Sequence, residues 1–321
     1  MNPIRSICGR TDPLIRMLVF AILLASFLPV TSEWRWLAQA ISDAAIFLLF
    51  LLNGLRLPRS EVGSGLRHRR YIVPVIIWVF GAMALAGWLV WHATTGFLPP
   101  LIAIGFVWLG VLPSTVQSAT AYTSLSGGSV AMSVIAAALL NIMAVFITIP
   151  LFTVIAGEAG TGLDASILRK VALVLLLPFA LGQLLQGRFG HWAKEQHSLV
   201  ARMDRTAIGI AVYVAFSGAV IEGLWNKVGF SDWAVLGSAV TLFLLWGFGG
   251  AWLLACLLNL AREERISFLF AGAHKSMAMG APLAAIAFDP AVAGMIMLPL
   301  LVYHITQMVI SAPLATRFSR G

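Results

Sequence analysis

A lysine lies in the middle of a long apolar segment, between a histidine and a serine. The segment Ser267–Phe288 contains His274, Lys275 and Ser276 near its centre. Lys275 is roughly 15 Å along a helix from either charged flank, so its side chain cannot reach water through lipid. A lysine at the bilayer centre costs about 2.5–3.5 kcal/mol on insertion scales and needs acceptors or a wet cavity. These three residues are therefore candidates for binding or coupling in transport.

A second polar interruption lies in the apolar segment Phe97–Ser124. It begins with Leu112 and Pro113, and its polar members are Ser114, Thr115, Gln117, Ser118 and Thr120. Proline interrupts the helical hydrogen bonds, and unpaired backbone at membrane depth is tolerated only where protein or a water-filled cavity satisfies it. The polar side chains either contact substrate or an ion, or they satisfy the freed backbone. We favour a direct role for Gln117, which has the longest reach.

Buried polar residues on neighbouring segments have the same two interpretations. Asn141, His304 and Gln307 could contact a transported solute, but hydrogen bonds between helices are the more frequent role of such residues. His274 adjoins Lys275 and therefore points to a different helix face. Substrate binding, proton relay and a hydrogen bond within a helix interface all remain open for it.

Composition places these segments in a membrane. Hydrophobic residues make up 60% of the 321 residues and charged residues 11%, against about 25% charged in a soluble domain. This excludes a soluble enzyme and a disordered chain. A spanning helix needs about 20 apolar residues, and the sequence predicts an all-α membrane protein with ten of them. The predicted spans are Leu14–Val30, Trp36–Leu55, Tyr71–His92, Phe97–Ser124, Val130–Ile155, Arg169–Gln186, Thr206–Leu224, Trp233–Asn259, Ser267–Phe288 and Ala291–Ala315.

The basic residues predict the orientation of these spans. If the first predicted span were a signal peptide, no other segment of the sequence could replace it as a transmembrane span. With both termini in the cytoplasm, sixteen of the 21 Lys and Arg residues lie on the cytoplasmic side and four outside, and Lys275 lies within a span. We therefore expect a multi-pass protein of a bacterial inner membrane, in contact with lipid. The net charge of +8 sets orientation and does not indicate binding to nucleic acid.

The two interruptions occupy matching positions in two halves, residues 1–155 and 156–321. Pro113 lies 17 residues before Val130, and Lys275 lies 17 residues before Val292. Each half holds five predicted spans, an odd number, so the second half enters the membrane from the opposite side. Interrupted helices at corresponding points of an inverted repeat indicate a transport site.

At these residues the sequence resembles the SBF-like branch of the bile acid:sodium symporter superfamily. The resemblance rests on the motif from Pro113 to Ser118, the connector Gly127-Gly128, His274-Lys275-Ser276 and the motif Gly280-Ala281-Pro282. It implies ten helices in two inverted five-helix repeats, with helices 4 and 9 discontinuous and crossing near the membrane centre. Helices 3, 4, 5, 8, 9 and 10 would form a core and helices 1, 2, 6 and 7 a panel, with substrate between them.

The sequence departs from the sodium-coupled members of that superfamily at their ion sites. Lys275 stands where those members carry a glutamate shared by two sodium ions. Ser118 and Ser133 match hydroxyl ligands, whereas Ala119 and Ala137 replace other ligands. A lysine amine offers only donors and repels a cation. Ser118 and Ser133 therefore remain the only residual sodium-site candidates, and no complete sodium site is expected.

Three roles of Lys275 remain open. Its ammonium could replace a bound sodium ion and hold the crossover together through Ser118, Ser133 and carbonyls at helix ends. It could instead lose and regain a proton during transport, because burial disfavours the charged amine. In the third alternative it lines a water-filled vestibule and attracts anions.

These patterns predict a secondary active transporter of a small organic anion that works by alternating access. Coupling would depend on protons or on Lys275, with sodium at a partial site as the alternative, and no cofactor is expected. A sensor or regulator that keeps the transporter fold is the second hypothesis. An intramembrane enzyme is the third, although the sequence lacks H-E-x-x-H, G-x-S-x-G and a paired nucleophile. A homo-oligomer is compatible with the sequence, which does not specify one.

Overall fold

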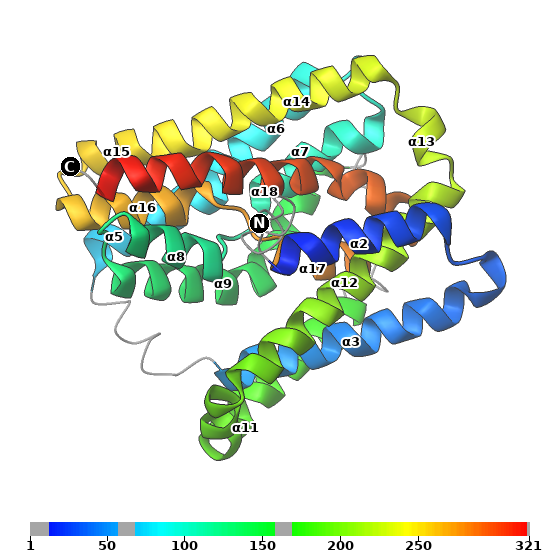
Figure 1. Cartoon of the computed structure of the whole chain (residues 1–321), viewed down its shortest axis with the longest axis horizontal. Coiled ribbons are helices and arrows are strands. Elements are labelled where there is room, and N and C mark those ends of the chain that lie inside the picture. The colour runs from blue at the N-terminus through cyan, green and yellow to red at the C-terminus, as the bar shows by residue number, and fades with distance from the viewer. Residues whose placement is uncertain (1–12, 57–67, 158–168, 320–321) are drawn as a thin grey trace, which may run out of the picture.

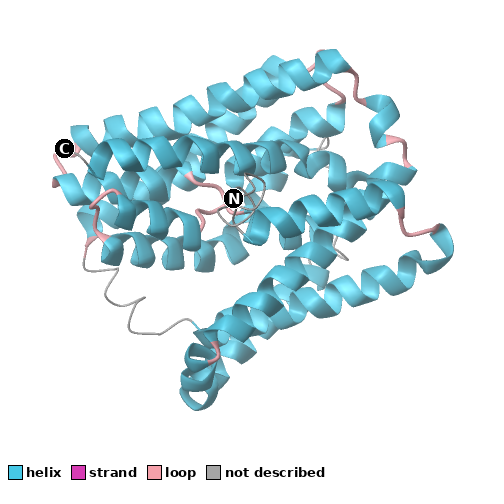
Figure 2. Ribbon diagram, in the orientation of Figure 1, coloured by secondary structure: helices cyan, strands magenta, loops and turns pink. Residues whose placement is uncertain are grey.

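The computed structural model describes residues 13–56, 68–157 and 169–319, and every named element in these ranges is a helix (Figure 2). Seven helical stretches in these ranges are long and apolar enough to cross a membrane, and Pro13–Phe27 and Pro100–Val111 are shorter apolar helices. The seven stretches are Ser32–Arg56, Arg69–Thr94, Val130–Ala156, Arg169–Ala193, His197–Ile221, Phe230–Leu257 and Pro290–Ser319. The chain is therefore an all-helical, multi-pass membrane protein.

Four long helices form one group, which we call the four-helix layer. Its members are α2 (Pro13–Phe27), α3 (Arg35–Arg56), α11 (Leu177–Glu195) and α12 (His197–Ile221). Helix α3 packs along α11, and α12 packs against both α2 and α3 (Figure 1). The backbones of α3 and α11 touch at two glycines, because a Cβ on Gly54 would overlap the carbonyl of Phe179, and one on Gly182 would overlap that of Leu51.

The other long helices form a larger group, which we call the bundle. Its members are α5 (Arg69–Ile77), α6 (Met83–Thr94), α7 (Pro100–Val111), α8 (Gln117–Leu125), α9 (Val130–Ala156), α14 (Phe230–Leu245), α15 (Ala251–Leu257), α16 (Arg262–Ala273), α17 (Met277–Ala287) and α18 (Pro290–Ser319). Helix α7 lies between α6 and α18, and α12 of the layer packs on α17 and α18. The short helices η1 (Ser32–Trp34) and α13 (Leu224–Lys227) precede α3 and α14.

Within the part of the chain that the structure describes, three π-helical turns interrupt the long helices: η2 (Trp78–Ala82), η4 (Ala172–Leu176) and η5 (Trp246–Gly250). Two of them meet, because the indole rings of Trp78 and Trp246 stack with centroids 5.4 Å apart. The glycine-rich run in η5 allows this approach, since a Cβ on Gly250 would overlap the ring of Trp78. Small residues thus pack two helices closely.

Both polar interruptions are non-helical, and they meet in space. Helix α7 ends at Val111 and α8 begins at Gln117, while α16 ends at Ala273 and α17 begins at Met277. The amide of Ser276 donates to the carbonyl of Pro113 at 3.0 Å. Segments about 160 residues apart in the sequence are therefore joined directly through their backbones.

Candidate functional site

The amine of Lys275 lies in a cage of three backbone carbonyls. Its Nζ donates to the carbonyl oxygens of Leu112 at 2.7 Å, Gly110 at 2.8 Å and Val79 at 3.3 Å. The side chain is 0% exposed, so it does not line a water-filled vestibule. We call these three oxygens the carbonyl cage. It joins η2 and the C-terminal end of α7 to the interruption between α16 and α17.

The backbone around Lys275 is fixed by side chains of α18. The amide of Gln307 forms two hydrogen bonds to this residue, because its Oε1 accepts from the N–H of Lys275 at 2.9 Å and its Nε2 donates to the carbonyl at 3.1 Å. The hydroxyl of Tyr303 donates to the carbonyl of Ala273 at 2.6 Å. These partners replace the helical bonds that the interruption removes.

Side chains of α9 satisfy the other interruption. Thr148 donates to the carbonyl of Val111 at 3.1 Å, and Asn141 donates to the carbonyl of Ser114 at 3.0 Å. Asn141 also bonds Ala137 in its own helix at 2.7 Å. Its amide therefore holds the backbone, the more frequent of the two roles that its sequence position predicts.

The expected contacts of Lys275 with Ser118 and Ser133 are not formed. The hydroxyl of Ser118 bonds Nδ1 of His274 at 2.9 Å and the hydroxyl of Thr115. Nε2 of His274 bonds the hydroxyl of Ser311 at 2.8 Å, so this buried imidazole has a partner at each ring nitrogen. Spacing along the chain gives the depth of these residues but not the direction of each side chain, which explains the difference.

Ser133 belongs to a separate cluster of hydroxyl groups. Its Oγ lies 3.4 Å from those of Thr120 and Thr123. The residual sodium-site candidates Ser118 and Ser133 therefore bond different partners. Across residues 13–56, 68–157 and 169–319, no group of three or more His, Cys, Asp or Glu residues could hold a metal ion.

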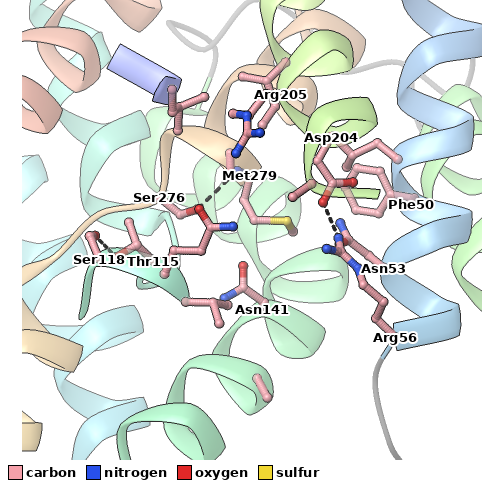
Figure 3. Close-up of a pocket in the computed structure, with 18 of the residues that line it drawn as sticks. Phe50, Asn53, Arg56, Thr115, Ser118, Asn141, Asp204, Arg205, Ser276 and Met279 are labelled. Atoms are coloured by element: carbon pink, nitrogen blue, oxygen red, sulfur yellow. Dashed lines mark hydrogen bonds and ion pairs between the residues drawn. The ribbon is translucent and has the colours of Figure 1, made fainter. Parts of the chain in front are cut away.

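A cavity of about 360 Å³ lies between the interruptions and the four-helix layer. Of the residues expected to act in transport, it collects Thr115, Gln117, Ser118, Asn141, Ser276 and His304 along its bundle side. Helices α3 and α12 form the opposite side, with Asn53, Arg56 and Asp204. In Figure 3 Thr115 and Ser118 lie across the cavity from Arg56 and Asp204.

Lys275 and His274 do not line this cavity. They lie behind its wall, where the carbonyl cage and the hydrogen bonds of His274 enclose them. His304 connects the two regions, since it lines the cavity and its Nδ1 accepts from Nε2 of Gln307 at 2.9 Å. Ser114 is buried and does not line the cavity, and its carbonyl accepts a hydrogen bond from Asn141. The predicted residues therefore fall into two groups: some line the cavity, and the others lie behind its wall.

The residues that line the cavity include two arginines and one acid. Arg56 and Asp204 form an ion pair across α3 and α12. Arg205 also lines the cavity, next to Asp204 in the sequence, and its charge acts on that carboxylate as well. The N-terminal ends of α8 and α17 reach the same cavity through Gln117 and Ala278, and helix N-termini carry partial positive charge.

Sequence reasoning missed Arg56, Asp204 and Arg205 as site residues. It placed both arginines in cytoplasmic loops, where they only set orientation. In the structure α3 extends to Arg56, and α12 begins at His197 rather than at Thr206. An acid within that first part of α12 is the only signal that could have indicated a site. Asp43, an acid within α3, pairs with Lys170 at 3.0 Å.

Comparisons with known proteins identify the family of this chain. The model of the SBF-like CPA transporter family matches residues 12–320. The protein named "Putative symporter YfeH" of Escherichia coli is 35% identical over 96% of this chain and 93% of its own length. "Sodium/bile acid cotransporter 7" of Mus musculus is 22% identical over 85% of this chain and 82% of its own length. The resemblance to the bile acid:sodium symporter superfamily is confirmed, and the chain belongs to the SBF-like CPA transporter family.

Proposed function

We propose that this chain is a secondary transporter that moves a small organic anion through the cavity between the bundle and the four-helix layer. The observation that carries the proposal is the excess of positive charge in the cavity, which Arg56 and Arg205 line together with a single acid, Asp204. The Arg56–Asp204 pair is neutral overall, so Arg205 leaves the cavity with a net positive charge. The N-terminal ends of α8 and α17 add to this field. A volume of about 360 Å³ suits a small ligand.

In this proposal the chain crosses the membrane ten times, as two inverted repeats of five spans. Helices α7 and α8 together form one discontinuous span, and α16 and α17 form another. The paired π-helical turns support the repeat, because η2 and η5 begin at Trp78 and Trp246, in the third and eighth spans. The repeat boundary would follow α9, near residue 155. Both termini would then lie in the cytoplasm of a bacterium, with the protein in its inner membrane.

Alternating access would move the four-helix layer against the bundle. The two groups are in close contact beyond the cavity, because a Cβ on Gly218 of α12 would overlap the carbonyl of Pro290, and one on Gly294 would lie 2.7 Å from the Cβ of Ala219. By the distribution of basic residues, this contact lies toward the outside and the cavity toward the cytoplasm. Uptake would require the contact between α12 and the start of α18 to open.

The names of the relatives support transport as the activity. The name of the Escherichia coli relative describes a symporter, and that of the mouse relative describes a cotransporter of sodium and bile acid, an organic anion. The arginines that line the cavity of this chain suit an anion.

The test compares two arginines of α12 that differ in position but not in charge. Organic anions are first screened by thermal shift on the purified protein, and those that stabilise it are assayed for uptake into proteoliposomes. Arg205→Gln should raise the KM for the anion at least about tenfold, the effect of losing one charge-assisted contact of about 1.5 kcal/mol. Arg202→Gln is the control, because Arg202 is exposed and does not line the cavity.

Each outcome distinguishes the hypotheses. Equal KM values for Arg205→Gln and Arg202→Gln would remove the proposed anion site. Saturable binding of an anion without flux in either direction would contradict transport and favour a sensor or regulator that keeps the transporter fold.

A further inference from the structure

We propose that the ammonium of Lys275 is a built-in cation that permanently fills a monovalent-cation site, the carbonyl cage of Val79, Gly110 and Leu112. The cage consists of the kind of ligand that binds small cations, namely backbone carbonyl oxygens pointing at one position. The occupant is attached to the protein, so it does not exchange with the solution. Occupancy of the cage follows from geometry alone, whereas its consequence for coupling rests on the proposed transport function.

The number of hydrogen-bond donors supports the charged form. An ammonium offers three N–H donors and no acceptor, and the cage presents three acceptors, at 2.7, 2.8 and 3.3 Å. A neutral amine has only two donors, and its lone pair would face the third carbonyl. The carbonyls of Gly110 and Leu112 lie at the C-terminal end of α7, where helical donors run out, and an ammonium supplies both of them and still has a third N–H for Val79.

The position of the cage supports the same conclusion. Gly110 lies in the last turn of α7 and Leu112 follows its last residue, where the helix has its partial negative charge. Val79 lies in the π-helical turn η2. A positive charge at this point is attracted by the helix end without any carboxylate, and the sequence provides none in either interruption.

Neighbouring ionisable groups do not share this role. His274 precedes Lys275, but its two ring nitrogens bond the hydroxyls of Ser118 and Ser311. His304 faces the backbone of Lys275 from α18 rather than its amine, with Nδ1 3.4 Å from the carbonyl oxygen. The amine thus contacts only the carbonyl cage, and its charge stabilises the junction of η2, α7 and the α16–α17 interruption.

This arrangement has a consequence for transport. A carrier whose cation site is filled by its own side chain has no need for a sodium ion at that site, and the junction stays closed throughout the cycle. Anion uptake should therefore continue at an unchanged rate when sodium is replaced by N-methylglucamine, provided that the proposed function holds.

The experiment removes the side chain and returns its missing part as a free ion. Lys275→Ala deletes the three outer methylenes and the ammonium, which correspond to n-propylammonium. This ion should raise the melting temperature of Lys275→Ala by about 3–6 °C at ten times its dissociation constant. Wild-type protein and Lys275→Met are the controls. In both, a side chain fills the space, so neither should respond. Propan-1-ol, a neutral molecule of similar size, should stabilise none of the three.

The result is decisive whether or not Lys275→Ala is stable alone. If it accumulates only when n-propylammonium is present during extraction, the cage is confirmed as a cation site. Equal responses of Lys275→Ala and Lys275→Met to n-propylammonium would overturn the proposal, as would a Lys275→Met protein as stable as wild type. These measurements need no substrate, so failure of the anion-transport proposal would leave them unchanged.

Discussion

Replacing Gln307 tests whether side chains of α18 hold the α16–α17 interruption in place. Gln307→Met keeps the length and volume of the side chain but removes the two hydrogen bonds to the N–H and carbonyl of Lys275, at 2.9 and 3.1 Å. Polar contacts between membrane helices contribute about 0.6 kcal/mol each on average, which would give roughly 1 kcal/mol. A buried backbone group left without a partner costs about 1–3 kcal/mol instead.

The second estimate applies here, because Lys275 lies outside both helices and its N–H has no helical carbonyl to bond. We therefore expect Gln307→Met to lose about 2–4 kcal/mol of stability. At about 2–4 °C per kcal/mol, the melting temperature in detergent should fall by at least about 4 °C.

Thr306→Val is the matched control for this substitution. Thr306 precedes Gln307 in α18, and its hydroxyl bonds only the carbonyl of Val302 within the same helix, at 2.8 Å. That carbonyl keeps its helical partner, so the loss should stay below about 0.5 kcal/mol. If the melting temperature of Gln307→Met falls no further than that of Thr306→Val, the interruption does not depend on Gln307, and the reasoning is refuted.

Two further predictions concern the surfaces on either side of the cavity. Gly218→Ala places a Cβ against the carbonyl of Pro290 and should destabilise the folded protein by about 1–3 kcal/mol. Gly237→Ala is the control, because open space surrounds Gly237, and it should be neutral or slightly stabilising. Equal melting temperatures of the two variants would show that the α12–α18 contact is not tight. Arg56→Gln leaves Asp204 as an unpaired acid beside the cavity and should weaken anion binding about tenfold, and Arg56→Gln with Asp204→Asn should restore most of it. Titration by calorimetry measures both affinities, and additive losses in the double variant would contradict the pairing.

The sequence located both interruptions because proline and polar side chains within an apolar segment have few alternatives in a membrane. The expected segments at Leu112–Thr120 and at His274–Lys275–Ser276 contain the non-helical residues observed between α7 and α8 and between α16 and α17. The sequence did not reveal which residues bond to these interruptions. Thr148 and Tyr303 are an ordinary threonine and tyrosine in long apolar segments, and only their contacts with Val111 and Ala273 reveal what they do.

The sequence by itself indicated a helical membrane protein, and it showed an amine without a neighbouring carboxylate in the middle of a long apolar segment. These conclusions follow from hydropathy and from distance along a helix, which are properties of the chain alone. The tertiary structure decided which groups surround that amine, three carbonyls rather than the hydroxyls of Ser118 and Ser133. It also decided that Arg205 lines a cavity. The physical reason is that linear spacing fixes the depth of a residue, whereas the rotation of each helix and the identity of its neighbours arise only when the helices pack.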